Sequence, residues 1–212
     1  IIISLILLTE TSLVLLEFID RYKENYTRTL GLRAFTGNIN ITAFIMVLQI
    51  PFYIYQAKKW KFLKIFFPVI FFTVILLGSR GANLSILLVL IIFVLLTFIK
   101  RFKVISKKNL VQIILSFFVA IGINNFLFDK NEDIKEGTSV SYVDRTTNLN
   151  TSSTQQRLRF YGDAIQSIKK NFFFGIGLGN WKIESIIYDK PHMKGYKVPY
   201  HVHNDFLEVF SE

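Results

Sequence analysis

The chain contains no cysteine, which excludes disulfides and thiolate metal sites. Acidic residues are scarce, with 15 Asp and Glu against 25 Lys and Arg, so the formal net charge is +10. No soluble basic domain is present to form a footprint on nucleic acid, so this charge does not indicate nucleic-acid binding. The first apolar block lacks the positively charged leader of a signal peptide. Because the chain opens inside one apolar block and stops just inside another, we expect a fragment of a larger membrane protein.

Apolar residues dominate what is present. They make up 51% of the chain, including 22 Phe, and the mean hydropathy is +0.40, which is too apolar for an ordinary soluble domain. The apolar blocks are Ile1–Ile19 (interrupted by Glu10 and Glu17), Ile39–Gln56, Phe62–Gly78, Ala82–Ile99 and Leu110–Phe128. Each is close to the roughly 17–25 residues that cross a bilayer as a helix. The sequence therefore predicts an all-α, polytopic transmembrane helical bundle with about five spans in residues 1–128.

The basic residues predict the orientation of these spans. Two short loops between blocks are basic, with Lys58, Lys59, Lys61 and Lys64 in one and Lys100, Arg101, Lys103, Lys107 and Lys108 in the other. Lys and Arg concentrate in cytoplasmic loops, so both loops are expected inside. The turn at residues 79–81 and a large loop over 129–202 then lie outside, and residues 203–212 begin a further span. Arg21, Lys23, Arg28 and Arg33 also fall outside, against the same rule.

The outer loop contains a predicted amphipathic helix near residues 154–171. Arg157, Tyr161, Ala164 and Ile168 share one stripe at helical spacing, with Arg159 and Asp163 on the other side. Arg159 and Asp163 are four residues apart and are expected to pair. This pattern predicts that Arg157 points along the apolar side and that Arg159 faces water.

An aromatic and glycine-rich passage follows from Phe172 to Trp181. It lacks the preceding strand and the glycine spacing of a dinucleotide fingerprint, so no cofactor is predicted. We expect a tight turn with its aromatic side chains at the level of the lipid headgroups. The alternative is that its backbone amides contact a substrate.

The end of the chain gathers titratable groups at His201, His203, Asn204 and Asp205. Imidazole titrates near neutral pH, so His203 is the candidate general base. The alternatives are a structural hydrogen bond that caps the following helix or a metal site formed by His201, His203 and Asp205 with His192. Two histidines at i and i+2 without a further ligand motif are poor evidence for a metal site, and no metal is predicted.

Five short motifs recur here in an order typical of one superfamily. They are Gly37-Asn-Ile-Asn40, Gly78-Ser-Arg80-Gly81, Arg157-x-x-x-Tyr161, Asn171-Phe-Phe-Phe-Gly175-Ile-Gly-Leu-Gly179-Asn-Trp181 and His203-Asn204-Asp205-Phe-Leu-Glu208. Over roughly residues 35–212 the chain resembles the O-antigen ligase and O-antigen polymerase superfamily of bacterial envelope proteins. Tyr161 stands where that superfamily frequently has Trp.

The resemblance implies a GT-C-like glycosyltransferase of the bacterial inner membrane with its active site on the periplasmic side. It would transfer an undecaprenyl-diphosphate-linked glycan to lipid A core or to a growing polysaccharide, without cofactor or metal. Carried over by position, Arg80, Arg157 and His203 are the catalytic candidates. Asn40, His201, Asn204 and Asp205 are the substrate-binding candidates. Arginine fits a lipid diphosphate because its planar fork donates paired hydrogen bonds and keeps its proton.

Two other functions stay open at this point. A transporter or flippase of lipid-linked oligosaccharide would also use arginines, although ionisable or broken helices at the bilayer midplane are expected there. A non-catalytic membrane scaffold would leave Arg80 and His203 dispensable. The sequence also leaves open ligase against polymerase.

Overall fold

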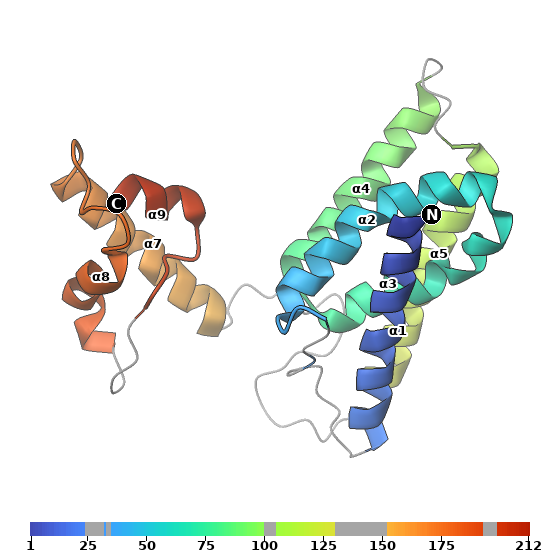
Figure 1. The fold of residues 1–212 in the computed structure, drawn as a ribbon, viewed down its shortest axis with the longest axis horizontal. Coiled ribbons are helices and arrows are strands. Elements are labelled where there is room, and N and C mark those ends of the chain that lie inside the picture. The colour runs from blue at the N-terminus through green and yellow to red at the C-terminus, as the bar shows by residue number, and fades with distance from the viewer. Residues whose placement is uncertain (24–31, 33–34, 100–104, 130–151, 193–198) are drawn as a thin grey trace. The chain divides into compact units, whose positions relative to one another are not determined.

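The computed structural model describes residues 1–23, 32, 35–99, 105–129, 152–192 and 199–212. The chain divides into two compact units, residues 1–147 and 148–212, and each is described here by itself. Regular structure in the described ranges is helical throughout, as the composition predicts (Figure 1).

The described residues of the first unit form five α-helices and one short 3₁₀-helix. They are α1 (Ile2–Lys23), α2 (Ile39–Lys59), η1 (Lys61–Phe66), α3 (Phe67–Leu77), α4 (Arg80–Phe98) and α5 (Lys107–Asp129). Four of these, α1, α2, α4 and α5, contain segments long and apolar enough to cross a membrane, with mean hydropathies of 2.1, 1.4, 2.6 and 2.0. They lie where the sequence predicts spans.

The sequence predicts one spanning helix over residues 62–78, and this prediction is wrong. The block is divided between η1 and α3, and α3 has 11 residues. At 1.5 Å per residue α3 is about 17 Å long, well short of the roughly 30 Å of a hydrocarbon core. Pro68 stands in the first turn of α3, where its missing N–H leaves no intrahelical bond unmade. Gly78 ends the helix in the left-handed conformation at φ 65°.

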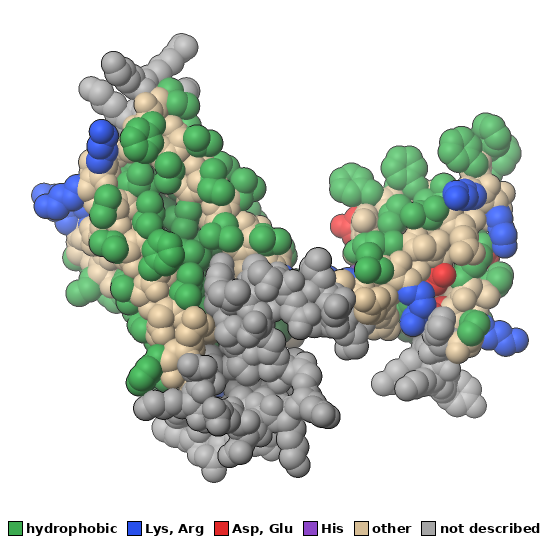
Figure 2. Space-filling view, turned by 180° about the vertical axis from the view of Figure 1, so that it is seen from behind, with side chains coloured by type: hydrophobic (Ala, Val, Ile, Leu, Met, Phe, Trp, Pro, Cys, Tyr) green, Lys and Arg blue, Asp and Glu red, His purple; other side chains and the backbone are tan. Residues whose placement is uncertain are grey.

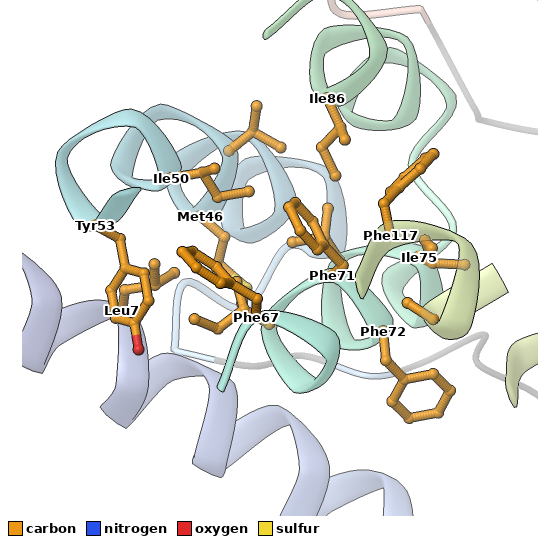
Figure 3. Packing of buried hydrophobic residues seen from close by; sticks show 14 of the residues in the cluster. Leu7, Met46, Ile50, Tyr53, Phe67, Phe71, Phe72, Ile75, Ile86 and Phe117 are labelled. Carbon is orange, nitrogen blue, oxygen red and sulfur yellow. The ribbon is translucent and has the colours of Figure 1, made fainter. Parts of the chain in front are cut away.

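The core of this unit is built around α3, and nine of its eleven residues are buried. Phe71 stacks on Phe67 of the same helix and meets Phe117 of α5 edge to face, with ring centroids 6.4 and 5.7 Å apart (Figure 3). Tyr53 of α2 packs edge-on against Phe67, and its hydroxyl donates to the carbonyl of Leu63 at 2.7 Å. The short helix therefore serves as the centre against which the spanning helices pack.

The helices α2 and α4 run in the same direction side by side (Figure 1). Gly81, at the start of α4, lies against the ring of Phe44, near the start of α2. Further along, Pro51 and Val89 line one apolar groove between the two helices. The first turns of α2 and α4 therefore lie at the same end of the unit.

The two basic loops meet at the opposite end. Lys64 of η1 donates a hydrogen bond to the side-chain oxygen of Asn109 in α5 at 2.8 Å. Lys58 and Lys59 end α2, and Lys107 and Lys108 begin α5. The bundle thus separates these lysines from the residues 79–81 turn, as the predicted alternation requires.

An acidic side chain lies inside the first span and has a partner. Glu10 of α1 is 6% exposed, and Gln49 of α2 donates to its carboxylate at 3.1 Å. A polar side chain in a span is tolerated when it faces the bundle interior and is hydrogen-bonded. This contact explains how Glu10 can interrupt an otherwise apolar block.

The second unit packs three α-helices around a small core. They are α7 (Ser152–Lys170), α8 (Trp181–Asp189) and α9 (Asp205–Ser211), with a single 3₁₀ turn, η2 (Lys190–His192), after α8. Its fully buried apolar side chains come from Ala164 of α7, Trp181 of α8 and Val202 before α9. Helix α7 is the amphipathic helix that the sequence predicts.

Both units carry exposed apolar side chains. In Figure 2 they cover much of the visible face of the first unit and gather along one side of the second. In the second unit Phe172, Phe173 and Phe174 are 73, 87 and 95% exposed. This exposure is compatible with the headgroup-level placement predicted for these rings, which stays a prediction.

Candidate functional site

The two terminal histidines flank a buried valine. Val202 is fully buried in the core of the second unit, whereas His201 and His203 are exposed. His203 takes φ +63°, the one non-glycine positive φ in the described part of the chain. His, Asn and Asp adopt this left-handed conformation more often than other side chains do. The buried valine and the turn together present both imidazoles on the surface.

Glu208 of α9 fixes the backbone of this segment. Its carboxylate accepts a hydrogen bond from the backbone N–H of Val202 at 2.9 Å. Its other oxygen lies 2.9 Å from Nδ1 of His201. One carboxylate therefore holds both the chain before the turn and the ring of His201.

The ring of His203 stacks on Phe160 of α7, with centroids 6.1 Å apart and planes 17° from parallel. Tyr161 of α7 donates its hydroxyl hydrogen bond to the backbone carbonyl of His203 at 3.2 Å. Partial burial lowers the pKa of His203, and electrostatic interactions with Arg157 and His201 lower it further, while Glu208 acts in the opposite direction. The neutral imidazole is therefore favoured at this position.

The two arginines of α7 do not lie as the helical pattern predicts. Arg157 is exposed. Arg159 forms an ion pair with Asp189 of α8, with 2.6 Å between Nε and Oδ1, and the carboxylate side chain is 5% exposed. The prediction that Arg159 faces water is wrong, because a buried carboxylate from another helix draws it inward. Arg157 is consequently the arginine of α7 that stays open to a ligand, with its charge close enough to act on His203.

The glycine-rich passage binds to α9. The amides of Ile176 and Gly177 donate to the carbonyls of Ser211 and Glu212 at 2.9 and 2.8 Å. Gly175 has φ +59°, and a Cβ there would overlap the backbone of Glu212. The amides of Ile176 and Gly177 are thus already hydrogen-bonded within the unit and are not free for a substrate. For the passage as a whole, substrate contact stays a prediction.

Asn204 and Asp205 begin α9. The side-chain oxygen of Asn204 accepts the N–H of Leu207 at 3.2 Å, which is an N-cap. Asp205 is exposed at the first position of the helix.

Arg80 and Asn40 belong to the first unit. Arg80 is half-buried and opens α4 directly after the buried Ser79, and Asn40 is exposed in the first turn of α2. Since α2 and α4 are parallel neighbours, the two residues lie at the same end of the bundle. The positive end of the α4 dipole adds to the charge of Arg80, an arrangement that favours an anion.

The candidate residues thus form two groups. Arg157, His201, His203, Asn204 and Asp205 belong to the second unit, where α7 and the segment that opens α9 pack together, and Arg80 and Asn40 lie at the same end of the first unit. Within the described ranges no three His, Asp or Glu side chains converge as metal ligands. The side chain of His192 lies outside the described residues.

Two residues that shape this site, Glu208 and Phe160, had no role in the sequence prediction. Glu208 reaches His201 seven positions earlier, and this contact depends on the left-handed turn at His203 between them. Phe160 lies beside the predicted stripe of α7 but is buried under the His203 ring. The sequence signal for Glu208 was only its presence in a segment rich in titratable groups.

Helices of spanning length packed around a shorter central helix, with a separate helical unit, define a polytopic helical membrane protein. The family model for O-antigen ligase matches residues 65–212, and the chain belongs to this family. It is therefore a glycan-transferring membrane enzyme of surface polysaccharide biosynthesis. Neither a curated protein nor a solved structure matches the chain.

Proposed function

We propose that the protein transfers a glycan from an undecaprenyl-diphosphate carrier to a hydroxyl of lipid A core or of a growing polysaccharide, on the periplasmic side of the inner membrane. The observation that carries this proposal is the grouping of Arg157 with two imidazoles on one exposed surface in front of α9. Cation and base are the two kinds of group that this reaction needs.

The cations act on the leaving group. As the bond between the anomeric carbon and the phosphate oxygen breaks, negative charge develops on the carrier diphosphate. Arg157 stabilises this charge through paired hydrogen bonds. Arg80, at the start of α4, is proposed to bind a phosphate group, and Asn40, at the same end of the first unit, is proposed to contact a sugar.

The imidazoles act on the acceptor. The acceptor oxygen bonds to the anomeric carbon, and its proton passes to an imidazole of the 201–203 segment, for which His203 is the candidate from the sequence. General base catalysis of this kind is typically worth about 10²–10⁴-fold in rate. Asn204 and Asp205 are proposed to orient the acceptor.

The test compares variants in a strain that lacks the native gene, with surface polysaccharide on gels and protein amount by immunoblot. We expect Arg157→Ala, Arg80→Ala and His203→Ala to lose polymer-bearing product at normal protein level, and Lys182→Ala on the exposed side of α8 to retain it. Arg157→Lys should recover only part of the output, because an ammonium lacks the planar fork.

The species that accumulates decides among the remaining possibilities. Uncapped core with intact polymer on its carrier identifies a ligase, and core bearing one repeat identifies a polymerase. Full output from all three variants contradicts the enzymatic proposal. Lipid-linked glycan retained on the inner leaflet would support a transporter instead.

A further inference from the structure

The two imidazoles of the site differ in their surroundings. The ring of His203 lies against Phe160, and its pKa is lowered, first by burial and then by Arg157 and His201. The side chain of His201 is 70% exposed and has a carboxylate partner. The sequence made His203 the candidate base and His201 a substrate-binding candidate, and this difference in surroundings bears on that assignment.

The contact with Glu208 determines which nitrogen of His201 carries the proton. A carboxylate only accepts hydrogen bonds, so the 2.9 Å contact to Nδ1 requires a hydrogen on that nitrogen. In the neutral ring the lone pair is then on Nε2. A second partner orients the carboxylate itself, because its other oxygen is bonded to the Val202 N–H.

This arrangement is that of an oriented base. A buried or half-buried carboxylate that holds Nδ1–H fixes the tautomer and the ring, and it balances the charge of the imidazolium that forms when Nε2 takes a proton. Glu208 is half-buried with its side chain 20% exposed, whereas His201 is open to an incoming molecule. His203 has no such carboxylate contact among the hydrogen bonds of the described residues, and its ring lies against Phe160.

We propose that His201, held in its Nδ1–H tautomer by Glu208, is the imidazole that deprotonates the acceptor hydroxyl. This inference rests on the proposed glycan transfer. In the step, the acceptor oxygen forms its bond to the anomeric carbon, the bond from that carbon to the phosphate oxygen breaks, and the hydroxyl proton moves to Nε2 of His201. The diphosphate leaves with the electron pair. Glu208 is a positioning residue.

The kinetic test uses the full chain, purified in detergent, with undecaprenyl-diphosphate-linked glycan and acceptor. His201→Ala should lower kcat by about 10²–10⁴-fold with little change in KM for the donor. Glu208→Gln keeps an acceptor oxygen for the Val202 N–H but removes the charge. We expect a fall in kcat of about 10–100-fold, the range found when orienting partners of metal-bound imidazoles are removed.

The double variant separates positioning from structure. If Glu208 acts through His201, then Glu208→Gln has no further effect in the His201→Ala background. Two controls make the same chemical changes elsewhere. They are Glu184→Gln in α8 and His192→Ala, which removes the remaining histidine of the chain.

A spectroscopic measurement addresses the tautomer directly. Ring ¹⁵N shifts of labelled protein should give His201 as the Nδ1–H form, and Glu208→Ala should shift it toward the Nε2–H form. The same spectra taken on Glu184→Gln should be unchanged. An Nε2–H form of His201 in the unsubstituted protein would overturn the assignment.

The kinetic outcomes distinguish this inference from the function on which it rests. If His201→Ala keeps activity within about threefold while His203→Ala is inactive, His203 is the base and the inference is wrong, although glycan transfer stands. An undiminished effect of Glu208→Gln in the His201→Ala background would overturn the pairing. Full activity of the His201, His203 and Arg157 variants would contradict both proposals.

Discussion

Two glycines in one loop give a matched measure of how the loop holds α9. Gly175 and Gly179 have φ +59° and +74°, so alanine is strained at either position by about 1–2 kcal/mol. A Cβ at Gly179 would meet nothing within 4 Å. A Cβ at Gly175 would overlap the backbone of Glu212, so the loop must move away from α9. Two backbone hydrogen bonds, from Ile176 and Gly177, are then lost at a net cost of about 1 kcal/mol each.

We therefore expect Gly175→Ala to destabilise the second unit by about 3–4 kcal/mol, against about 1–2 kcal/mol for Gly179→Ala. Hydrogen exchange at the amides of Ile176 and Gly177 measures this directly. The difference of about 2 kcal/mol corresponds to exchange roughly 30-fold faster in Gly175→Ala than in Gly179→Ala. Glycan transfer should fall more in Gly175→Ala, because α9 carries Glu208.

Equal exchange rates at the two amides in both variants would refute this reasoning. The close approach to Glu212 would then contribute nothing beyond the shared backbone strain. Faster exchange in Gly179→Ala would show that the loop depends more on its contacts near α8 than on its hydrogen bonds to α9.

Three further predictions address charge and topology. In ¹³C-labelled full-length protein the ring of His203 should titrate below the ordinary pKa of about 6.5; Arg157→Gln should raise the pKa and Glu208→Gln should lower it. Since the folded state favours the neutral ring, the stability of the second unit should fall as pH drops through about 6.5. Hydrogen-exchange protection that rises on acidification would contradict this predicted direction. Asp189→Asn should destabilise the second unit by about 1–3 kcal/mol, which is less than the loss of a fully buried ion pair because the Arg159 side chain is 32% exposed. Hydrogen exchange at the amides of α8 measures this change, with Glu184→Gln as the control. Because the chain has no cysteine, single-cysteine variants report topology without background labelling. In cells with a permeable outer membrane, a membrane-impermeant maleimide should label Phe35→Cys and leave Lys59→Cys unlabelled. The reverse labelling pattern would show that the predicted orientation is inverted.

The spans could be predicted because the signal is nearly independent of packing. A run of about 20 apolar residues identifies α1, α2, α4 and α5 by length and composition alone. The error at residues 62–78 has a local cause. Lys61 and Lys64 belong to η1, and Pro68 favours a helix start over the continuation of a helix. Hydropathy averages over these three residues and does not detect the break.

The site could be predicted less completely, because its geometry depends on contacts between elements. The helical stripe of α7 predicted the helix correctly but placed Arg159 toward water, since the partner that draws Arg159 inward, Asp189, lies 30 residues later. The glycines were identified as a turn, but not as the contact surface for α9. Local periodicity contains no information on such partners, whereas a left-handed glycine is a recognisable local requirement.

The conformation of His203 connects these observations. A left-handed backbone costs a non-glycine residue energy, and it persists only where the surroundings determine it. Here the carbonyl of His203 accepts from Tyr161, its ring stacks on Phe160, and the residues on either side are fixed by the burial of Val202 and the cap of Asn204. With this turn in place His201 lies 2.9 Å from Glu208, so the contacts around the left-handed residue also surround the pair of residues proposed to activate the acceptor.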